Sequence, residues 1–283
     1  MNAIEIKNLS KSYPGFELRD INLELPAGSI MGLVGENGAG KTTTLKLIMN
    51  AISRDSGSVK VLGVDNQAKE FNAVKEDIGV VLDEAYFPEV LTPKHVGKVM
   101  KNTYRNWDDT CYYNFLERFK LPETKAFKDF SRGMKMKLAI AVAMSHRPKL
   151  LILDEATSGL DPIVRDEILD IFNDFTRDET HSVLLSSHIV SDLEKICDYI
   201  AFIHNGRLLF CEEKDKLLEE YAIVRMSKDD FEKLPKEAVK GKKVNKYGVE
   251  ALVLKSAVSR MFNTEYTTLE DIILFLAKGD RKQ

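Results

Sequence analysis

The feature that most constrains this chain of 283 residues is an eight-residue motif of the form G-x-x-x-x-G-K-T. It reads Gly35-Glu36-Asn37-Gly38-Ala39-Gly40-Lys41-Thr42, and Thr43 follows it. Glycines allow successive backbone N–H groups to turn inward around an anion without clashes from Cβ atoms. A lysine and a hydroxyl at the end of such a loop can bind phosphate oxygens and Mg²⁺, respectively. The motif therefore predicts a nucleotide phosphate site, with Thr42 as a Mg²⁺ ligand.

The segments around this motif have the order that such a loop requires. Ser29–Val34 is a continuous apolar run, as expected for a strand that is covered on both faces of a sheet. A helix is expected from the motif to about Met49, and its N-terminus would add partial positive charge at the phosphates. In the first 30 residues, alternating apolar positions such as Ile4 and Ile6 predict half-buried antiparallel strands. An ordinary glycine loop is the alternative, but this frame favours phosphate binding.

A second apolar run, Leu150–Leu153, is followed by two carboxylates, Asp154 and Glu155. Ligand sites of α/β proteins lie at the carboxyl ends of the strands. We expect Asp154 to hold Mg²⁺, through a water, and Glu155 to orient or deprotonate the attacking water. An Asp-Glu pair at the end of a strand is more often a helix-capping device, so this interpretation depends on the upstream phosphate loop.

Composition excludes several classes of protein. The 41 basic and 44 acidic residues give a net charge of −3, without the basic excess of sequence-independent nucleic-acid binders. Cys111, Cys197 and Cys211 are scattered, which predicts free thiols in a reducing compartment. Charges at Glu5 and Lys7 interrupt any signal peptide, and no run approaches the ~20 apolar residues of a membrane span. We therefore expect the chain not to cross a membrane.

The remaining patterns predict the division of the chain. Residues 84–148 have mostly helical patterning, and Thr92-Pro93 is a helix-start signature. Strands are expected at Ser182–Ser186 and Tyr199–His204, and Asn205-Gly206 predicts a type I′ hairpin. After about residue 220 the sequence becomes crowded with charges, and a strand at Gly248–Leu254 and a final amphipathic helix follow. These observations predict a main domain over residues 1–220 and a small accessory domain over residues 221–283.

Four more short sequence features accompany the phosphate loop, one before it in the chain and three after it. They are Tyr13 before the first hairpin, Phe130-Ser131-Arg132-Gly133-Met134, Ser158-Gly159-Leu160-Asp161, and His188 just after a predicted strand. Together with the phosphate loop and Asp154-Glu155, they resemble the ATP-binding subunit of ABC transporters over about residues 2–220. The resemblance implies an α/β fold: a P-loop ATPase core with an antiparallel β subdomain and an α-helical insert at about 84–148, plus a small C-terminal α+β domain.

The resemblance also implies roles for these features, with ATP and Mg²⁺ as the cofactors. Tyr13 would stack on adenine, and His188 would contact the γ-phosphate as a catalytic residue. Taken alone, Tyr13 would be a packing residue and His188 a satisfied loop histidine. Ser131 and Gly133 would bind the nucleotide of a second ATP-binding subunit in a head-to-tail dimer, because a helix that opens there presents N–H groups to phosphate. The sequence leaves homodimer and heterodimer open.

Three residues depart from the family's pattern. The signature motif usually reads Leu-Ser-Gly-Gly-Gln, but this chain has Arg132 and Met134 at the third and fifth positions. The Cβ atom of Arg132 would strain the loop if a positive φ were needed there. After the predicted strand Ile78–Leu82, the chain has Asp83 where the family has glutamine. Because a carboxylate can ligate Mg²⁺ directly or through water, Asp83 is predicted as a metal-site residue.

Weaker phrases resemble the ATPases of bacterial bacitracin- and lantibiotic-resistance exporters. They are Phe130–Lys135, Asn106-Trp107-Asp108 and Thr268–Ile272. The resemblance implies a separate integral-membrane permease as partner, no nucleic-acid partner, and a cytoplasmic location, peripheral on the inner face of the cell membrane. Tyr86, Phe87 and Pro88 form either a permease contact patch or local core packing.

Two other classes of function are weighed against transport. Soluble ABC ATPases that act on DNA would need long coiled-coil heptads, and those that act on ribosomes carry two cassettes, whereas this chain has one phosphate loop. A single-cassette ATPase in cofactor or complex assembly remains as the alternative. Co-purification with a membrane permease or with a soluble complex would discriminate between these functions.

Overall fold

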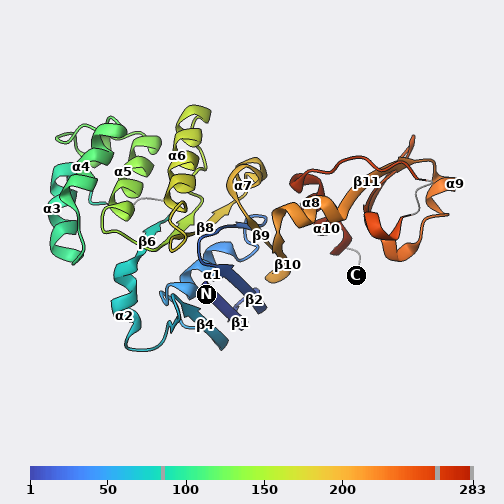
Figure 1. Ribbon diagram of the computed structural model, residues 1–283, viewed down its shortest axis with the longest axis horizontal. Helices are drawn as coiled ribbons and strands as arrows, with labels where there is room; N and C mark the ends of the chain where they lie inside the picture. Colours follow the sequence, from blue (N-terminus) through green and yellow to red (C-terminus); the bar gives the residue numbers. More distant parts are fainter. Residues whose placement is uncertain (84–86, 259–261, 281–283) are drawn as a thin grey trace.

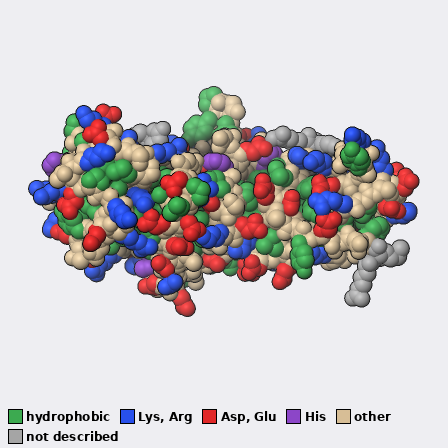
Figure 2. Space-filling model, turned by 90° about the horizontal axis from the view of Figure 1, so that it is seen from above, with side chains coloured by type: hydrophobic (Ala, Val, Ile, Leu, Met, Phe, Trp, Pro, Cys, Tyr) green, Lys and Arg blue, Asp and Glu red, His purple; other side chains and the backbone are tan. Residues whose placement is uncertain are grey.

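The structure of the protein is a computed structural model that describes residues 1–83, 87–258 and 262–280. The molecule is elongated, with helices α3–α5 at one end, a large sheet in the middle and the C-terminal elements at the other end (Figure 1). Acidic and basic side chains are interspersed over the face that Figure 2 shows. Within the described residues, no helix has the length and apolar character needed to span a bilayer.

The central sheet has ten strands in the order β5-β4-β1-β2-β10-β9-β3-β8-β7-β6. Their bounds are β1 Asn2–Tyr13, β2 Phe16–Pro26, β3 Ile30–Val34, β4 Ser56–Val61, β5 Val64–Asp65, β6 Ile78–Val81, β7 Leu150–Asp154, β8 Ser182–Ser187, β9 Tyr199–His204 and β10 Arg207–Glu213. Strands β9, β3, β8, β7 and β6 are parallel to one another, whereas β2, β1, β4 and β5 pair antiparallel. The predicted α/β core and antiparallel subdomain are therefore both present.

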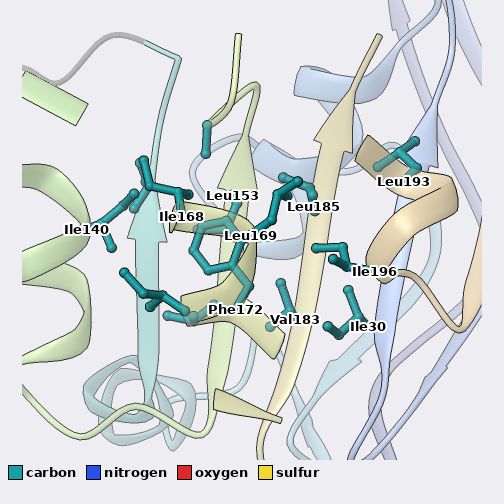
Figure 3. Close-up of a cluster of buried hydrophobic side chains, with 14 of the residues drawn as sticks. Ile30, Ile140, Leu153, Ile168, Leu169, Phe172, Val183, Leu185, Leu193 and Ile196 are labelled. Carbon is teal, nitrogen blue, oxygen red and sulfur yellow. The ribbon is translucent and has the colours of Figure 1, made fainter. Parts of the chain in front are cut away.

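The parallel strands are buried on both faces, as their continuous apolar sequences predict. In β3, Ile30 and Val34 join one hydrophobic core, and Met31 and Leu33 join the other. Figure 3 shows the first core, in which Phe172 and its neighbours pack over the sheet. Such two-sided burial fixes the strand register, because a slip by one residue would exchange the two faces. The carboxyl ends of the parallel strands are thereby held at one edge.

The helices of this part cover the sheet and form the insert. Their bounds are α1 Lys41–Ile48, α2 Phe71–Val74, α3 Pro93–Thr103, α4 Asp109–Arg118, α5 Arg132–Met144, α6 Pro162–Phe175, α7 Val190–Ile196 and α8 Lys214–Glu220, with 3₁₀ turns at Lys75–Asp77 and Phe127–Asp129. The predicted helix start at Thr92 is confirmed, because its hydroxyl accepts a hydrogen bond from the backbone N–H of His95. Helices α3–α5 make the region between β6 and β7 mostly helical, as predicted.

The hairpin between β9 and β10 forms where Asn205-Gly206 predicts it. Both residues have positive φ, 48° and 73°, as a type I′ turn requires. Asn205 tolerates this conformation better than most residues with a Cβ atom. The turn lies against β2, since the N–H of Arg19 donates to the Gly206 carbonyl at 2.8 Å.

The C-terminal elements form a second, three-stranded sheet in the order β11-β13-β12. The elements are β11 Tyr221–Met226, α9 Lys228–Phe231, β12 Val239–Asn245, β13 Gly248–Leu254 and α10 Leu269–Asp280, with 3₁₀ turns at Lys236–Ala238 and Lys255–Ala257. Strand β13 lies where the sequence predicts it. Leu269 and Ile272 of α10 belong to the same hydrophobic core as α6 and α7. The C-terminal sheet is thus attached to the rest of the fold through a shared core.

Candidate phosphate-binding and catalytic site

One edge of the central sheet carries most of the predicted site. In the parallel register, Val34 of β3 lies opposite Ser187 of β8, and Asp154 of β7 lies opposite Ser186. The residues that follow these strands therefore emerge side by side. This explains how the phosphate loop, the Asp154-Glu155 pair and His188, which are distant in sequence, meet in space.

The phosphate loop needs glycine at its ends for steric reasons. A Cβ atom on Gly35 would lie 2.4 Å from the backbone oxygen of Ile203 in β9, so only glycine allows this close approach. Gly40 is the N-cap of α1 and has a φ of 117°, which residues with a Cβ atom rarely adopt. Between them, Glu36, Asn37 and Gly38 are exposed at the loop tip, while Ala39 is buried. The N-terminus of α1 opens directly from this loop, where its partial positive charge favours an anion.

Lys41 is the first residue of α1, and its side chain is buried. The ammonium Nζ donates to the backbone oxygen of Gly35 at 2.8 Å and lies 3.3 Å from Oε1 of Glu155. A buried ammonium is stable only with such partners. The positive charge is therefore held between the loop backbone and the predicted catalytic carboxylate, where phosphate oxygens are expected.

Asp154 is the best-anchored acid of the site. Its Oδ2 accepts a hydrogen bond from the hydroxyl of Thr42 at 2.9 Å, and its Oδ1 accepts one from the hydroxyl of Ser186 at 2.5 Å. The two predicted metal ligands, Thr42 and Asp154, are thus adjacent. Ser186 was not predicted as a site residue, although its place at the end of a buried strand beside the acidic strand was an available signal.

Glu155 has an unusual backbone and a preorganised carboxylate. Its φ is 51°, a conformation that costs energy in a residue with a Cβ atom, and its N–H donates to the backbone oxygen of Ser186 at 3.1 Å. Oε2 lies 2.6 Å from Nδ1 of His188. Oε1 is buried and accepts no hydrogen bond within the described ranges. The structure thus brings Glu155 and His188 together.

The remaining predicted nucleotide-binding residues are Tyr13, Ser131, Gly133 and Thr43. Tyr13 is at the end of β1, partly exposed, with the ammonium of Lys11 5.6 Å from its ring centroid. Ser131 caps α5, since its hydroxyl accepts from the backbone N–H of Met134 at 3.3 Å. In the part of the chain that the structure describes, no hydrogen bond or ion pair joins Ser131 or Gly133 to the phosphate loop. Thr43 follows Thr42 in the first turn of α1 and is half-buried.

Asp83 lies against Arg132 instead of the other predicted metal ligands. Its Oδ1 is 3.1 Å from Nη2 of Arg132, and no hydrogen bond between described residues joins it to Thr42 or Asp154. The strain considered for Arg132 does not occur, because this residue is the first of α5 and is not among those with positive φ. Of the predicted contact patch, Tyr86 lies outside the described residues, and Phe87 packs edge-on against Phe127 with ring centroids 5.5 Å apart.

The loop, the buried lysine and the paired acids at the strand ends define an ATPase of the phosphate-loop type. Comparison with known proteins then identifies the family. Residues 18–158 match the family described as ABC transporter. The ATP-binding protein YtrB of Bacillus subtilis is 34% identical over 227 residues, which cover 80% of this chain and 77% of the relative. This chain belongs to the ABC transporter family, as an ATP-binding protein and ATPase.

Other relatives and solved structures agree. The lantibiotic transport ATP-binding protein SrtF of Streptococcus pyogenes is 34% identical and covers 75% of this chain and 91% of its own. The bacitracin transport ATP-binding protein BcrA of Enterococcus faecalis is also 34% identical, with coverages of 73% and 68%. A solved ATP-binding subunit of an ABC transporter superposes with a TM-score of 0.69 at 27% identity, covering 76% of this chain and 91% of that one. The dimeric ATP-binding cassette MJ0796, bound to ADP and Pi, shares the fold, with a TM-score of 0.67 at 21% identity and coverages of 74% and 98%.

Proposed function

We propose that this chain hydrolyses MgATP as one of two paired cassettes and powers a separate integral-membrane permease that exports a peptide, drug or similar compound. The observation that carries the proposal is the contact of Glu155 with both Lys41 and His188, because it places a carboxylate beside the predicted phosphate site. The names of the relatives SrtF and BcrA, which refer to lantibiotic and bacitracin transport, support the export of such compounds.

Binding of ATP would use the loop and the residues around it. The backbone N–H groups of the Gly35–Thr43 segment and the N-terminus of α1 would hold the phosphates, and Lys41 would exchange its present oxygen partners for the β- and γ-phosphates. Tyr13, at the end of β1, presents an aromatic face for adenine, a contact worth about 1–3 kcal/mol for a base on an aromatic ring.

The residues present fit a magnesium ion. Mg²⁺ is usually bound by one or two carboxylates together with substrate phosphates, not by an all-protein cage. The adjacent hydroxyl of Thr42 and carboxylate of Asp154 would hold the ion, and the ion would neutralise charge on the phosphates.

Glu155 is the best candidate for the general base. Its buried Oε1 has capacity to accept a proton from a water, and Lys41 and His188 fix the carboxylate on two sides. A positioned base of this kind contributes about 10²–10⁴-fold in rate. His188 would orient the carboxylate and contact the γ-phosphate with its remaining ring nitrogen.

A second subunit would complete the site. Ser131 and Gly133 open α5 in the helical insert and are not joined to the phosphate loop of the same chain by any described hydrogen bond or ion pair. We propose that they bind the γ-phosphate held by the partner subunit in a head-to-tail dimer. A dimeric solved cassette of the same fold supports this arrangement. ATP would then join the two subunits, and hydrolysis would loosen them.

The helical insert would contact the permease, and the protein would lie peripherally on the cytoplasmic face of the cell membrane. Pro88 and Val90 are exposed apolar residues at the start of the insert, which suits such a contact. The second candidate, a soluble assembly ATPase, is less well supported, because the named relatives include transport proteins.

The test is affinity purification of the tagged chain from detergent extracts of its native cells, with and without MgATP, followed by mass spectrometry of the partners. We expect a polytopic membrane protein in stoichiometric amount. A stoichiometric soluble partner without any membrane protein would favour the assembly function instead.

A further inference from the structure

The guanidinium of Arg132 lies where three segments of the chain meet. Its Nη2 is 3.1 Å from Oδ1 of Asp83, which lies two positions after the end of β6. Both side chains are about half exposed, at 55% and 51%. The pair links the first residue of α5, in the helical insert, to the carboxyl edge of the central sheet.

The same guanidinium also lies against Gly159, in the turn between Glu155 and α6. A Cβ atom built on Gly159 would lie 2.9 Å from Nη1 and 3.0 Å from Cζ of Arg132. Nitrogen and carbon atoms of the guanidinium therefore occupy the space that any other residue at position 159 would fill. Beside this contact, a Cβ atom on Gly133 would lie 3.7 Å from Cδ2 of Leu160, so Leu160 also lies close to the start of α5.

These contacts connect the two parts of the proposed site that serve different nucleotides. The turn after Glu155 and the segment after β6 belong to the edge where the chain's own ATP would bind. Ser131, directly before Arg132, would serve the ATP of the partner subunit. A planar guanidinium suits this position, because it can hold a carboxylate in its plane while its face lies on a backbone turn.

We propose that Arg132 is a positioning residue that couples these two half-sites within one chain, with Asp83 and Gly159 as its partners. The inference rests on the proposed two-subunit function. It also gives Asp83 a role as the anion that orients Arg132, in place of direct metal binding. Exposed ion pairs contribute little to global stability, so the effect of the pair should appear in local order and turnover and not in unfolding.

The test compares Arg132→Ala, Asp83→Ala and the double variant with wild type in the full chain. Native-state hydrogen exchange should become about 5-fold faster in the segments 131–136 and 156–161 for each single variant. The kcat for MgATP should fall about 10-fold, while the Kd of a fluorescent ATP analogue changes less than about 2-fold. The double variant should resemble the singles, because either substitution removes the same contact.

Arg147→Ala is the matched control. Arg147 also pairs with an aspartate of the insert, Asp108 at 2.8 Å, but at the far end of α5. The Arg147→Ala variant should keep the wild-type kcat and the wild-type rate of hydrogen exchange in both segments. If Arg132→Ala does not fold, Arg132→Lys and Asp83→Ala decide the outcome, since lysine keeps the charge but has no flat group to lie on Gly159. Arg132→Lys should then show faster exchange in segment 156–161.

The proposal would be overturned if the single variants exchanged hydrogen in segments 131–136 and 156–161 at the wild-type rate. It would also be overturned if the losses of kcat were additive in the double variant. A failure of the proposed function can be distinguished from a failure of this inference. If the wild-type chain had no ATPase activity, the exchange measurements would still decide whether Arg132 couples the segments.

Discussion

Nδ1 of His188 lies 2.6 Å from Oε2 of Glu155, directly after the ends of two neighbouring parallel strands. The other carboxylate oxygen lies 3.3 Å from Nζ of Lys41. Glu155 is thus fixed on both sides, at a backbone conformation that a free loop would not choose. This arrangement connects the fold to the proposed reaction, because the strand register holds Glu155, His188 and the phosphate loop together.

His188→Ala should lower kcat by about 10- to 100-fold with a smaller change in the Kd of ATP, since the imidazole orients the carboxylate and contacts only the γ-phosphate, whereas the phosphate loop and Lys41 hold the whole triphosphate. Steady-state ATPase assays and a nucleotide-binding titration check this prediction. His95→Ala, which removes an exposed histidine of α3, is the control and should retain activity. An unchanged kcat in His188→Ala would remove His188 from the catalytic site.

Lys41→Ala should weaken ATP binding by about 10- to 100-fold, because charge-assisted hydrogen bonds contribute about 1.5–3 kcal/mol each. The measurement is a calorimetric titration with MgATP. Lys46→Ala serves as the control, since Lys46 lies on the same helix but is exposed. Equal affinities of the two variants for MgATP would show that Lys41 of the phosphate loop does not bind the triphosphate.

Ser131 can be tested with two substitutions that differ in charge alone. Asparagine and aspartate are both good N-caps, so Ser131→Asn and Ser131→Asp should keep α5 and melt within a few degrees of wild type. If Ser131 faces a phosphate of the partner subunit, Ser131→Asp should lose at least about 10-fold more ATPase activity than Ser131→Asn, through charge repulsion. Similar activities in the two variants would contradict that contact.

Much of the site follows from local sequence. The phosphate loop, the Asp154-Glu155 pair and the hairpin at Asn205-Gly206 could be predicted because each depends on a few neighbouring residues with special backbone or chemical requirements. Strand β12 was missed, because it is an outer strand of its sheet in which Lys240, Lys242 and Lys243 are exposed, so it lacks an apolar pattern.

The contact of Arg132 with Asp83 could not be predicted either. The two residues are 49 positions apart, and their approach depends on how the helical insert packs on the sheet. The sequence predicts Asp83 as a metal-site residue because it stands where the family has glutamine, and this local reasoning could not show that its carboxylate lies 3.1 Å from the guanidinium of Arg132. Tertiary packing, which no local pattern encodes, decides such pairings.

Stability should fall with increasing pH because of the partly buried thiol of Cys211. All three cysteines are free, and burial raises the pKa of Cys211 to about 11. Because an unfolded thiol ionises near pH ~8.5, deprotonation stabilises the unfolded chain between about pH 8.5 and 11. From about pH 7.5 to 9.5, wild type should therefore lose about 1.4 kcal/mol more stability than Cys211→Ala.

Urea unfolding of both proteins at the two pH values measures this difference. The change in unfolding free energy between the two pH values is compared for each protein. The packing energy lost in the variant then cancels, since that loss is the same at both pH values. Identical pH dependence in wild type and Cys211→Ala would show that the thiol ionises freely in the folded protein.

The central claim is that ATP cleavage needs Glu155 and two copies of a cassette, and light scattering on Glu155→Gln with MgATP tests it most directly. We predict that this variant binds ATP and that light scattering gives a mass of twice the 32.1 kDa of the chain. In an ATPase assay it should turn over at least about 10²-fold more slowly than wild type. Wild-type turnover by Glu155→Gln, or full wild-type activity in a sample that remains monomeric with nucleotide bound, would contradict the account.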